Sequence, residues 1–234
     1  MIDVLKKIKL YGFKRSIKYI IKDLFNILWM QTFCNSFSQK GEDLIIDKLL
    51  GFKSNGIYVD IGAHHPTRFS NTKRFYNRGW RGINIDSNPD LIKKFEVERE
   101  RDINLSLGVG GKNGRLTFYE FFPSTLSTFS EEETERYLKQ GYKLISKRQV
   151  SVKTLSSVLE KYFASRNIDF LSIDTEGMDL EILQSNNWKK YKPYVICTEN
   201  HGNSASITGY LETQGYQLKY NNGLNSIFSV SLGL

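Results

Sequence analysis

Four short apolar segments, each ending at an acidic residue, constrain the fold most. Residues 57–59, 83–85, 170–173 and 194–197 have the composition of buried strands, and they lead to Asp60, Asp86, Asp174 and, after Thr198, Glu199. Helical stretches separate them, which predicts an α/β fold with a doubly wound, mostly parallel sheet. Helix capping explains any one of these acids. Because ligands bind at the carboxyl ends of such strands, we expect all four acids to share one cleft.

The rest of the chain fits the same α/β pattern. Further strands are expected at 103–107, 116–122 and 149–152, and helices at 43–50, 70–77, 89–101, 131–140, 155–163 and around 180–183. Segments 216–220 and 226–230 flank Asn221-Asn222-Gly223, which predicts a hairpin. This C-terminal hairpin is expected to add an antiparallel strand to the edge of the sheet.

Composition limits the class of protein. The 234 residues are 40 % hydrophobic, which suits a folded core and excludes wholesale disorder. Two cysteines, Cys34 and Cys197, cannot form a disulfide scaffold or a four-thiolate zinc site, and we expect a cytoplasmic protein. The sequence has neither an apolar run of spanning length nor a signal-peptide pattern. No nucleic-acid-binding motif accompanies the basic residues, so no nucleic-acid partner is expected.

The N-terminal segment carries most of the positive charge. The chain has a net charge of +8, and residues 1–30 hold seven basic and two acidic residues. One helix face is apolar and consists of Ile17, Ile20, Ile21, Leu24 and Leu28. We therefore divide the chain into a basic helical extension, 1–37, and a catalytic domain, 38–234. We expect the helix to pack on the domain; the alternative is contact of residues 1–30 with a partner protein or the inner face of a membrane.

The first strand-end turn indicates the type of ligand. Gly62 can adopt a positive φ and lets a ligand approach the backbone. Asp86 lies 24 residues further on, about where an acid binds ribose hydroxyls in dinucleotide-binding folds. The glycines that pack against a pyrophosphate are missing, and several carboxylates would repel one. A cationic ligand with a ribose, such as S-adenosylmethionine, fits better.

Three segments together resemble the FkbM family of S-adenosylmethionine-dependent methyltransferases. They are Asp60-Ile61-Gly62-Ala63-His64-His65-Pro66, Gly79-Trp80-Arg81-Gly82-Ile83-Asn84-Ile85-Asp86 and Asp174-Thr175-Glu176-Gly177. The similarity runs from about Ser38 to the C-terminus. It implies a Rossmann-like class I methyltransferase fold and O-methylation of sugars and related hydroxylated metabolites.

The resemblance also implies the cofactor contacts. Asp60, Gly62 and Ala63 would contact the methionine end, Asp86 the ribose, and Ser87, Ser106 and Leu107 would lie near the adenine. His64 and Asp174 complete the expected cofactor-binding set.

Methyl transfer to a hydroxyl needs a base or a metal ion, because the hydroxyl must lose its proton. The catalytic candidates are His201, Asp174 and His65; histidine suits a base at neutral pH. Asp174, Glu199 and Asn200 offer an alternative, a set of oxygen ligands for Mg²⁺ or another divalent ion. The alternatives to a metal site are that Asp174 and Glu176 hold the substrate or the following loop by hydrogen bonds, and that Glu176 and Asp179 cap a helix. Residues 121–130, with Ser124, Thr125, Ser127 and Thr128 between aromatics, form either an acceptor-facing loop or an ordinary surface loop.

These features lead to one function and two alternatives. The predicted activity is S-adenosylmethionine-dependent O-methylation of a sugar, a nucleotide-linked sugar or a glycan precursor, as in polysaccharide biosynthesis. A nucleotide-dependent Rossmann oxidoreductase and a non-catalytic membrane or partner adaptor are the alternatives.

Overall fold

A seven-stranded sheet forms the centre of the molecule. The computed structural model describes residues 25, 28–163, 167–200, 202 and 204–230. The strand order is β3-β2-β1-β7-β8-β10-β9. The strands are β1 (Ile57–Ile61), β2 (Arg81–Asp86), β3 (Ile103–Ser106), β7 (Phe170–Ile173), β8 (Val195–Glu199), β9 (Tyr216–Asn221) and β10 (Asn225–Val230). β10 pairs antiparallel with both β8 and β9, while the other pairs are parallel. The predicted doubly wound sheet with a C-terminal antiparallel hairpin is confirmed.

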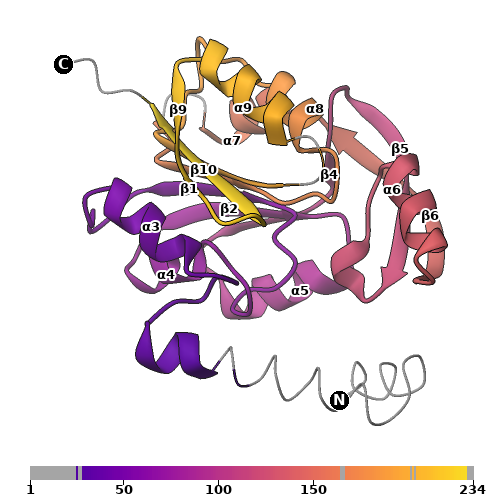
Figure 1. Ribbon diagram of the computed structural model, residues 1–234, viewed down its shortest axis with the longest axis horizontal. Coiled ribbons are helices and arrows are strands. Elements are labelled where there is room, and N and C mark those ends of the chain that lie inside the picture. The colour runs from indigo at the N-terminus through magenta and orange to yellow at the C-terminus, as the bar shows by residue number, and fades with distance from the viewer. Residues whose placement is uncertain (1–24, 26–27, 164–166, 201, 203, 231–234) are drawn as a thin grey trace.

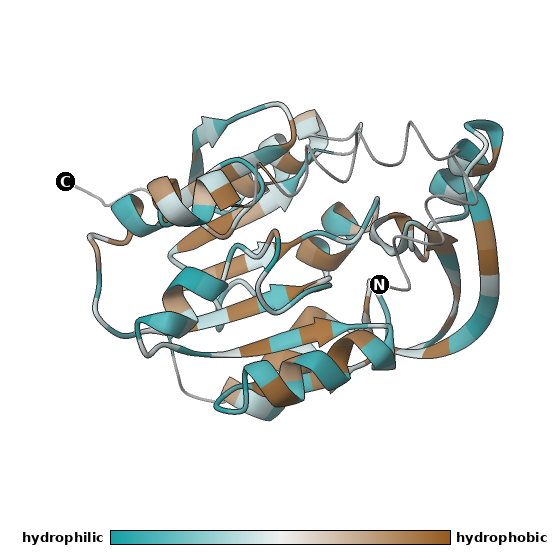
Figure 2. Cartoon of the chain, turned by 90° about the horizontal axis from the view of Figure 1, so that it is seen from below, coloured by the Kyte–Doolittle hydropathy of each residue, from teal (hydrophilic) through white to brown (hydrophobic). Residues whose placement is uncertain are grey.

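Helices cover both faces of this sheet (Figure 1). One layer contains α3 (Glu42–Leu49), α4 (Lys73–Asn77) and α5 (Pro89–Glu98), and the other contains α7 (Leu155–Phe163), α8 (Asp179–Gln184) and α9 (Ser204–Thr213). Side chains alternate along β1, so Val59 joins the core under α7–α9 and Tyr58 joins the core under α3 and α4. Figure 2 shows hydrophobic residues along the sheet strands, and the central strands β1 and β7 are buried on both faces.

A second, smaller sheet lies beside one end of the main sheet (Figure 1). Its order is β4-β6-β5, formed by β4 (Gly108–Val109), β5 (Gly114–Phe122) and β6 (Lys143–Lys153), and it carries η1 (Ser124–Leu126) and α6 (Glu131–Lys139). The sequence did not predict a separate sheet, and the strand expected at 149–152 is in fact the 11-residue β6. Exposed residues alternate with less exposed ones along β6, and many of both are polar, so its apolar pattern is weak.

Buried Arg99 explains two helices that are shorter than expected. α5 ends at Glu98 rather than near residue 101, because Arg99 leaves helical geometry and its side chain is fully buried. The guanidinium group donates to the Pro66 carbonyl at 2.9 Å and to Ser70 Oγ at 2.7 Å. These bonds hold residues before Lys73 as a turn, so α4 begins three residues later than predicted. Helix α9 was not predicted.

The N-terminal extension is described only in part. Ile17, Ile20, Ile21 and Leu24 of the predicted apolar helix face lie outside the described residues. Residues 28–33 are helical, and Leu28 is 62 % exposed, so this part of the face does not pack on the domain as expected. Among the described residues, no helix has the length and apolarity needed to cross a bilayer. Both cysteines are free thiols.

The turns after β1 and β7 touch at Gly62. Gly62 has a φ of +76°, as expected. A Cβ atom at this position would lie 1.7 Å from the carbonyl oxygen of Asp174. Since the neighbouring chain occupies that space, packing of the two turns requires glycine here, whereas the sequence had indicated room for a ligand.

We predict that Gly62→Ala lowers the free energy of unfolding by about 3 kcal/mol or more, because the added methyl group overlaps backbone. The matched control is Gly79→Ala. Gly79 also has a positive φ, +104°, but nothing lies within 4 Å of its Cβ position. Gly79→Ala should therefore lower the free energy of unfolding only by the cost of holding alanine in a left-handed backbone conformation, about 1–2 kcal/mol. Urea unfolding measures both; equal losses would contradict the close-packing explanation.

Candidate functional site

A cavity of about 440 Å³ opens at the carboxyl ends of the parallel strands. Its volume falls in the usual range for small-molecule sites, about 300–1,000 Å³. The predicted residues that line it are Asp60, Gly62, Ala63, His64, Asp86, Ser87, Leu107, Asp174 and Glu199. The four strand-end acids therefore share one cavity, as the sequence predicts.

Strand register explains this convergence. Ile61 pairs with Ile173, and Ile173 pairs with Thr198, so the residues that follow are lateral neighbours: Gly62, Asp174 and Glu199. Alternate residues of a strand share a face. In β1 and β2 the apolar residues adjacent to Asp60 and Asp86 point into the core under α7–α9. The two aspartates consequently point away from that core, and both line the cavity at the carboxyl ends of the strands together with Ile61 and Ile85.

Asp60 is nearly buried and is oriented by one hydroxyl group. Thr72 Oγ1 donates to Asp60 Oδ2 at 2.6 Å, and Arg99 donates to the same hydroxyl at 2.8 Å. Burial raises the pKa of Asp60 to about 6, against the lowering effect of the Thr72 bond. The carboxyl group is thus held in place by a buried chain of donors.

Asp86 accepts two backbone hydrogen bonds. His64 N donates to Oδ2 at 3.0 Å and Asn88 N to Oδ1 at 2.7 Å. Burial raises the pKa of Asp86 to about 6, and these two bonds oppose the rise. Each carboxylate oxygen can accept a second bond, so Asp86 can still receive two ribose hydroxyls.

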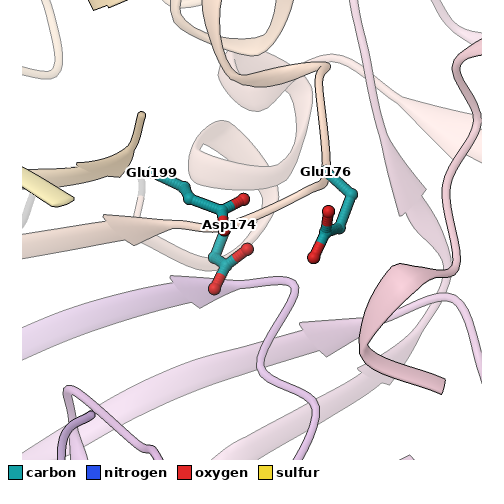
Figure 3. Close-up of side chains that lie close together, drawn as sticks. All are labelled: Asp174, Glu176 and Glu199. Carbon is teal, nitrogen blue, oxygen red and sulfur yellow. The ribbon is translucent and has the colours of Figure 1, made fainter. Parts of the chain in front are cut away.

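Three carboxyl groups form a cluster in the cavity (Figure 3). One oxygen from each of Asp174, Glu176 and Glu199 lies within 4.8 Å of the others. Burial, and then the charge of Asp174, raise the pKa of Glu176 to about 8. The same two causes raise the pKa of Glu199 well above its usual range, and a hydrogen bond with Asp174 adds to the rise. Asp174 is the most exposed of the three.

Glu176 belongs to the cluster, whereas the sequence analysis did not include it among the metal ligands and gave helix capping as one of its alternatives. It lies before α8 with a φ of +54°, and Tyr137 donates to its carboxylate. Its carbonyl accepts from Thr128 Oγ1 at 2.7 Å. Both partners come from the region of the smaller sheet, and local sequence patterns do not predict that this region lies beside β7. The one sequence signal for a role of Glu176 in the site was the segment Asp174-Thr175-Glu176-Gly177, which resembles the family.

Three of the predicted residues that the structure describes, His65, Asn200 and Ser106, do not line the cavity. His65 Nδ1 instead accepts from the backbone of Thr67 and Arg68, both at 3.1 Å, which gives it a turn-forming role. Asn200 Oδ1 accepts from Ser226 Oγ at 2.7 Å, so Glu176 takes its place in the cluster. Ser106 is exposed at the end of β3. His201 lies outside the described residues.

The smaller sheet and η1 build the facing wall. Phe118, Phe122, Phe129, Ser124, Thr125 and Ser127 line the cavity from this side. His64 Nε2 and Ser124 Oγ lie 3.0 Å apart, which joins the turn after β1 to this wall. Three members of the predicted hydroxyl-rich loop therefore do face the cavity.

The match to a protein-family model identifies the family of this chain. The Methyltransferase FkbM domain model matches residues 60–218, more than half of the chain. The chain belongs to the FkbM methyltransferase family. Membership gives methyl transfer from S-adenosylmethionine as the reaction class and confirms the resemblance seen in the sequence. A search of curated proteins returns no significant match.

Several solved methyltransferases are similar to this FkbM-family chain. TrmK of M. capricolum, solved with S-adenosylhomocysteine, is 13 % identical over 79 % of this chain and 66 % of its own, with a TM-score of 0.39. A precorrin-6y C5,15-methyltransferase from Geobacter metallireducens is 13 % identical over 80 % and 86 %, with a TM-score of 0.40. The METTL16 methyltransferase domain is 13 % identical over 81 % and 66 %, with a TM-score of 0.44.

The charged and apolar side chains on the cavity wall fit the cofactor of this family. S-adenosylmethionine has a sulfonium and an ammonium group, which suit the carboxylates of Asp60 and Asp174. Its ribose suits Asp86, whose oxygens retain acceptor capacity. Val109 and Phe118, with Leu107, supply apolar surface for adenine.

We predict that S-adenosylmethionine affinity falls at low pH more steeply than S-adenosylhomocysteine affinity. Asp60 and Asp86, both with a pKa of about 6, are ionised at pH 7.5 and protonated at pH 5. The methylated ligand has one more positive charge, so losing anionic neighbours weakens it more. We expect its Kd to rise at least tenfold, about 1.4 kcal/mol.

Calorimetry at the two pH values measures this difference. Asp60→Asn is the control: its amide oxygen can still accept from Thr72, but it has no charge to lose, so the pH dependence should shrink to the part that Asp86 contributes. Identical pH profiles for the two ligands in the wild-type protein would contradict the electrostatic account.

Proposed function

We propose that this protein methylates a hydroxyl group of a sugar, a nucleotide-linked sugar or a glycan precursor. The observation that carries the proposal is the exposed Asp174 carboxyl group in a cavity whose facing wall combines hydroxyls with aromatic rings. Hydroxyls and aromatic faces suit sugar rings. Family membership favours methyl transfer over the oxidoreductase and adaptor alternatives.

The proposed reaction is an in-line displacement with proton removal. When bound, S-adenosylmethionine supplies an electrophilic methyl group: the acceptor oxygen forms the new C–O bond while the C–S bond breaks and its electron pair stays on sulfur. Asp174 accepts the proton that leaves the hydroxyl group. General-base assistance of this kind contributes about 10²–10⁴ in rate.

The neighbours of Asp174 prepare it for this role. Its hydrogen bond with Glu199 fixes the position of the carboxyl group. The buried glutamates beside it favour uptake of a proton by the cluster, because like charges in one cavity repel. His201 follows β8 and remains a predicted alternative base.

The same cluster supports a second mechanism. Asp174, Glu176 and Glu199 provide only oxygen donors, which suits Mg²⁺ or another hard divalent ion. Such an ion would supply Lewis-acid activation of the hydroxyl group. We favour the base mechanism because Asp174 and Glu199 already share a hydrogen bond, which needs one proton on the pair.

We predict that Asp174→Asn lowers kcat about 10²–10³-fold at saturating S-adenosylmethionine, because saturation offsets any loss of cofactor affinity and leaves the loss of the base. Transfer of a labelled methyl group to a panel of nucleotide sugars measures kcat. Asp90→Asn is the matched control, because Asp90 is an exposed acid on α5 that does not itself line the cavity. Unchanged kcat in the Asp174 variant would contradict the assignment.

Exhaustive chelation then separates the two mechanisms. The base mechanism predicts full activity after EDTA treatment and dialysis. Loss of activity that returns with Mg²⁺ would support the metal alternative instead.

A further inference from the structure

Arg68 is the single lysine or arginine among the described residues that line the cavity. The same wall contains five acids: Asp60, Asp86, Asp174, Glu176 and Glu199. These acids suit the positive groups of the cofactor. The positive groups of the cofactor do not explain why a positively charged guanidinium group lies in the same cavity.

The guanidinium group of Arg68 lacks a polar partner within the described part of the chain. Its Nε is buried and makes no hydrogen bond, and the group lies 5.5 Å from the centre of the Phe69 ring. Nearby arginines differ: Arg99 binds Pro66 and Ser70, and Arg148 binds Glu120. Arg68 as a whole is half-buried, but a buried Nε without a partner is costly, so its position points to a partner supplied from outside.

The turn that carries Arg68 is fixed on both sides. Arg68 N donates to His65 Nδ1 at 3.1 Å, and Arg99 holds Pro66 and Ser70. The flanking backbone is therefore anchored before any ligand arrives. Such preorganisation reduces the entropy lost on binding.

We propose that Arg68 binds a carboxylate or phosphate group of a ligand in the cavity. The planar guanidinium fork matches both anions with paired hydrogen bonds. Two sources can supply this chemistry: the carboxylate of the cofactor's methionine part, or an acidic group of the acceptor, such as a sugar acid or a nucleotide diphosphate. The second source rests on the proposed function.

Calorimetry of Arg68→Gln with three probes tests the proposal. S-adenosylhomocysteine has the methionine carboxylate, 5′-methylthioadenosine lacks it, and UDP-glucuronic acid added to the S-adenosylhomocysteine-loaded protein represents an acidic acceptor. A cofactor role predicts at least tenfold weaker S-adenosylhomocysteine binding with unchanged methylthioadenosine binding. An acceptor role predicts unchanged binding of both and at least tenfold weaker UDP-glucuronic acid binding.

Two controls keep the outcome interpretable. Arg115→Gln removes an exposed arginine outside the cavity and should leave all three affinities unchanged. The Tm of Arg68→Gln should match the wild type, because no bond within the described chain is lost. Wild-type affinity of the variant for all three probes overturns the proposal. A failure to detect methyl transfer would leave these binding results standing.

The N-terminal helix carries an independent observation. Phe25, Leu28, Trp29 and Phe33, here called the aromatic face, are 63 %, 62 %, 49 % and 70 % exposed. Successive rings lie next to each other, with centroids 6.2 Å apart for the stacked Phe25 and Trp29 and 4.6 Å apart for the tilted pair Trp29 and Phe33. A clustered apolar surface of this kind marks an interaction site.

Charge indicates the partner. Residues 1–30 hold seven basic residues against two acidic ones, and all seven basic residues precede Phe25 in the sequence. Exposed aromatic side chains next to basic sequence are typical of segments that lie in the interface of anionic bilayers. We propose that the aromatic face inserts into the headgroup region of an anionic membrane and so brings the methyltransferase domain to that surface.

Vesicle sedimentation of the full chain tests this proposal. Vesicles of phosphatidylcholine with phosphatidylglycerol should retain the protein at least tenfold better than phosphatidylcholine alone, and Phe25→Ser/Trp29→Ser/Phe33→Ser should abolish the difference. The control Val97→Ser/Leu138→Ser/Ile145→Ser changes other exposed apolar residues and should bind as the wild type. No sedimentation with anionic vesicles, or an aromatic-face variant that only loses self-association, overturns it.

Discussion

The contact between Gly62 and the Asp174 carbonyl determines the geometry of the candidate site. It sets the turns after β1 and β7 side by side, closer than any residue with a Cβ atom permits. Parallel register then places Glu199 next to Asp174. A cavity with converging carboxyl groups is therefore a consequence of sheet pairing and of one backbone approach.

Arg99 stabilises the other half of the site. Its bonds to Pro66, Ser70 and Thr72 pin the turn between β1 and α4, and Thr72 in turn orients Asp60. The same turn presents Arg68 to the cavity. The buried guanidinium group of Arg99 thus positions both Asp60, which suits the positive groups of the cofactor, and the positively charged Arg68, which suits an anion.

The features that could be predicted are those that depend on residues close together in the sequence. Strand-end acids, Pro89 at a helix start and the Asn-Gly hairpin follow from short-range rules, and each lies where expected. The predictions that were wrong or incomplete concern features that depend on contacts between residues far apart in the sequence. The length of β6 depends on pairing with β5, and Glu176 reaches the cluster through bonds from Thr128 and Tyr137. His65 looked catalytic but serves the turn beside it.

A crystal structure of the protein with S-adenosylhomocysteine tests the central claim most directly. We expect one ligand in the cavity, its ribose hydroxyls bonded to Asp86 and its sulfur near Asp174. A ligand bound elsewhere, or one whose ribose does not contact Asp86, would contradict this account of the site.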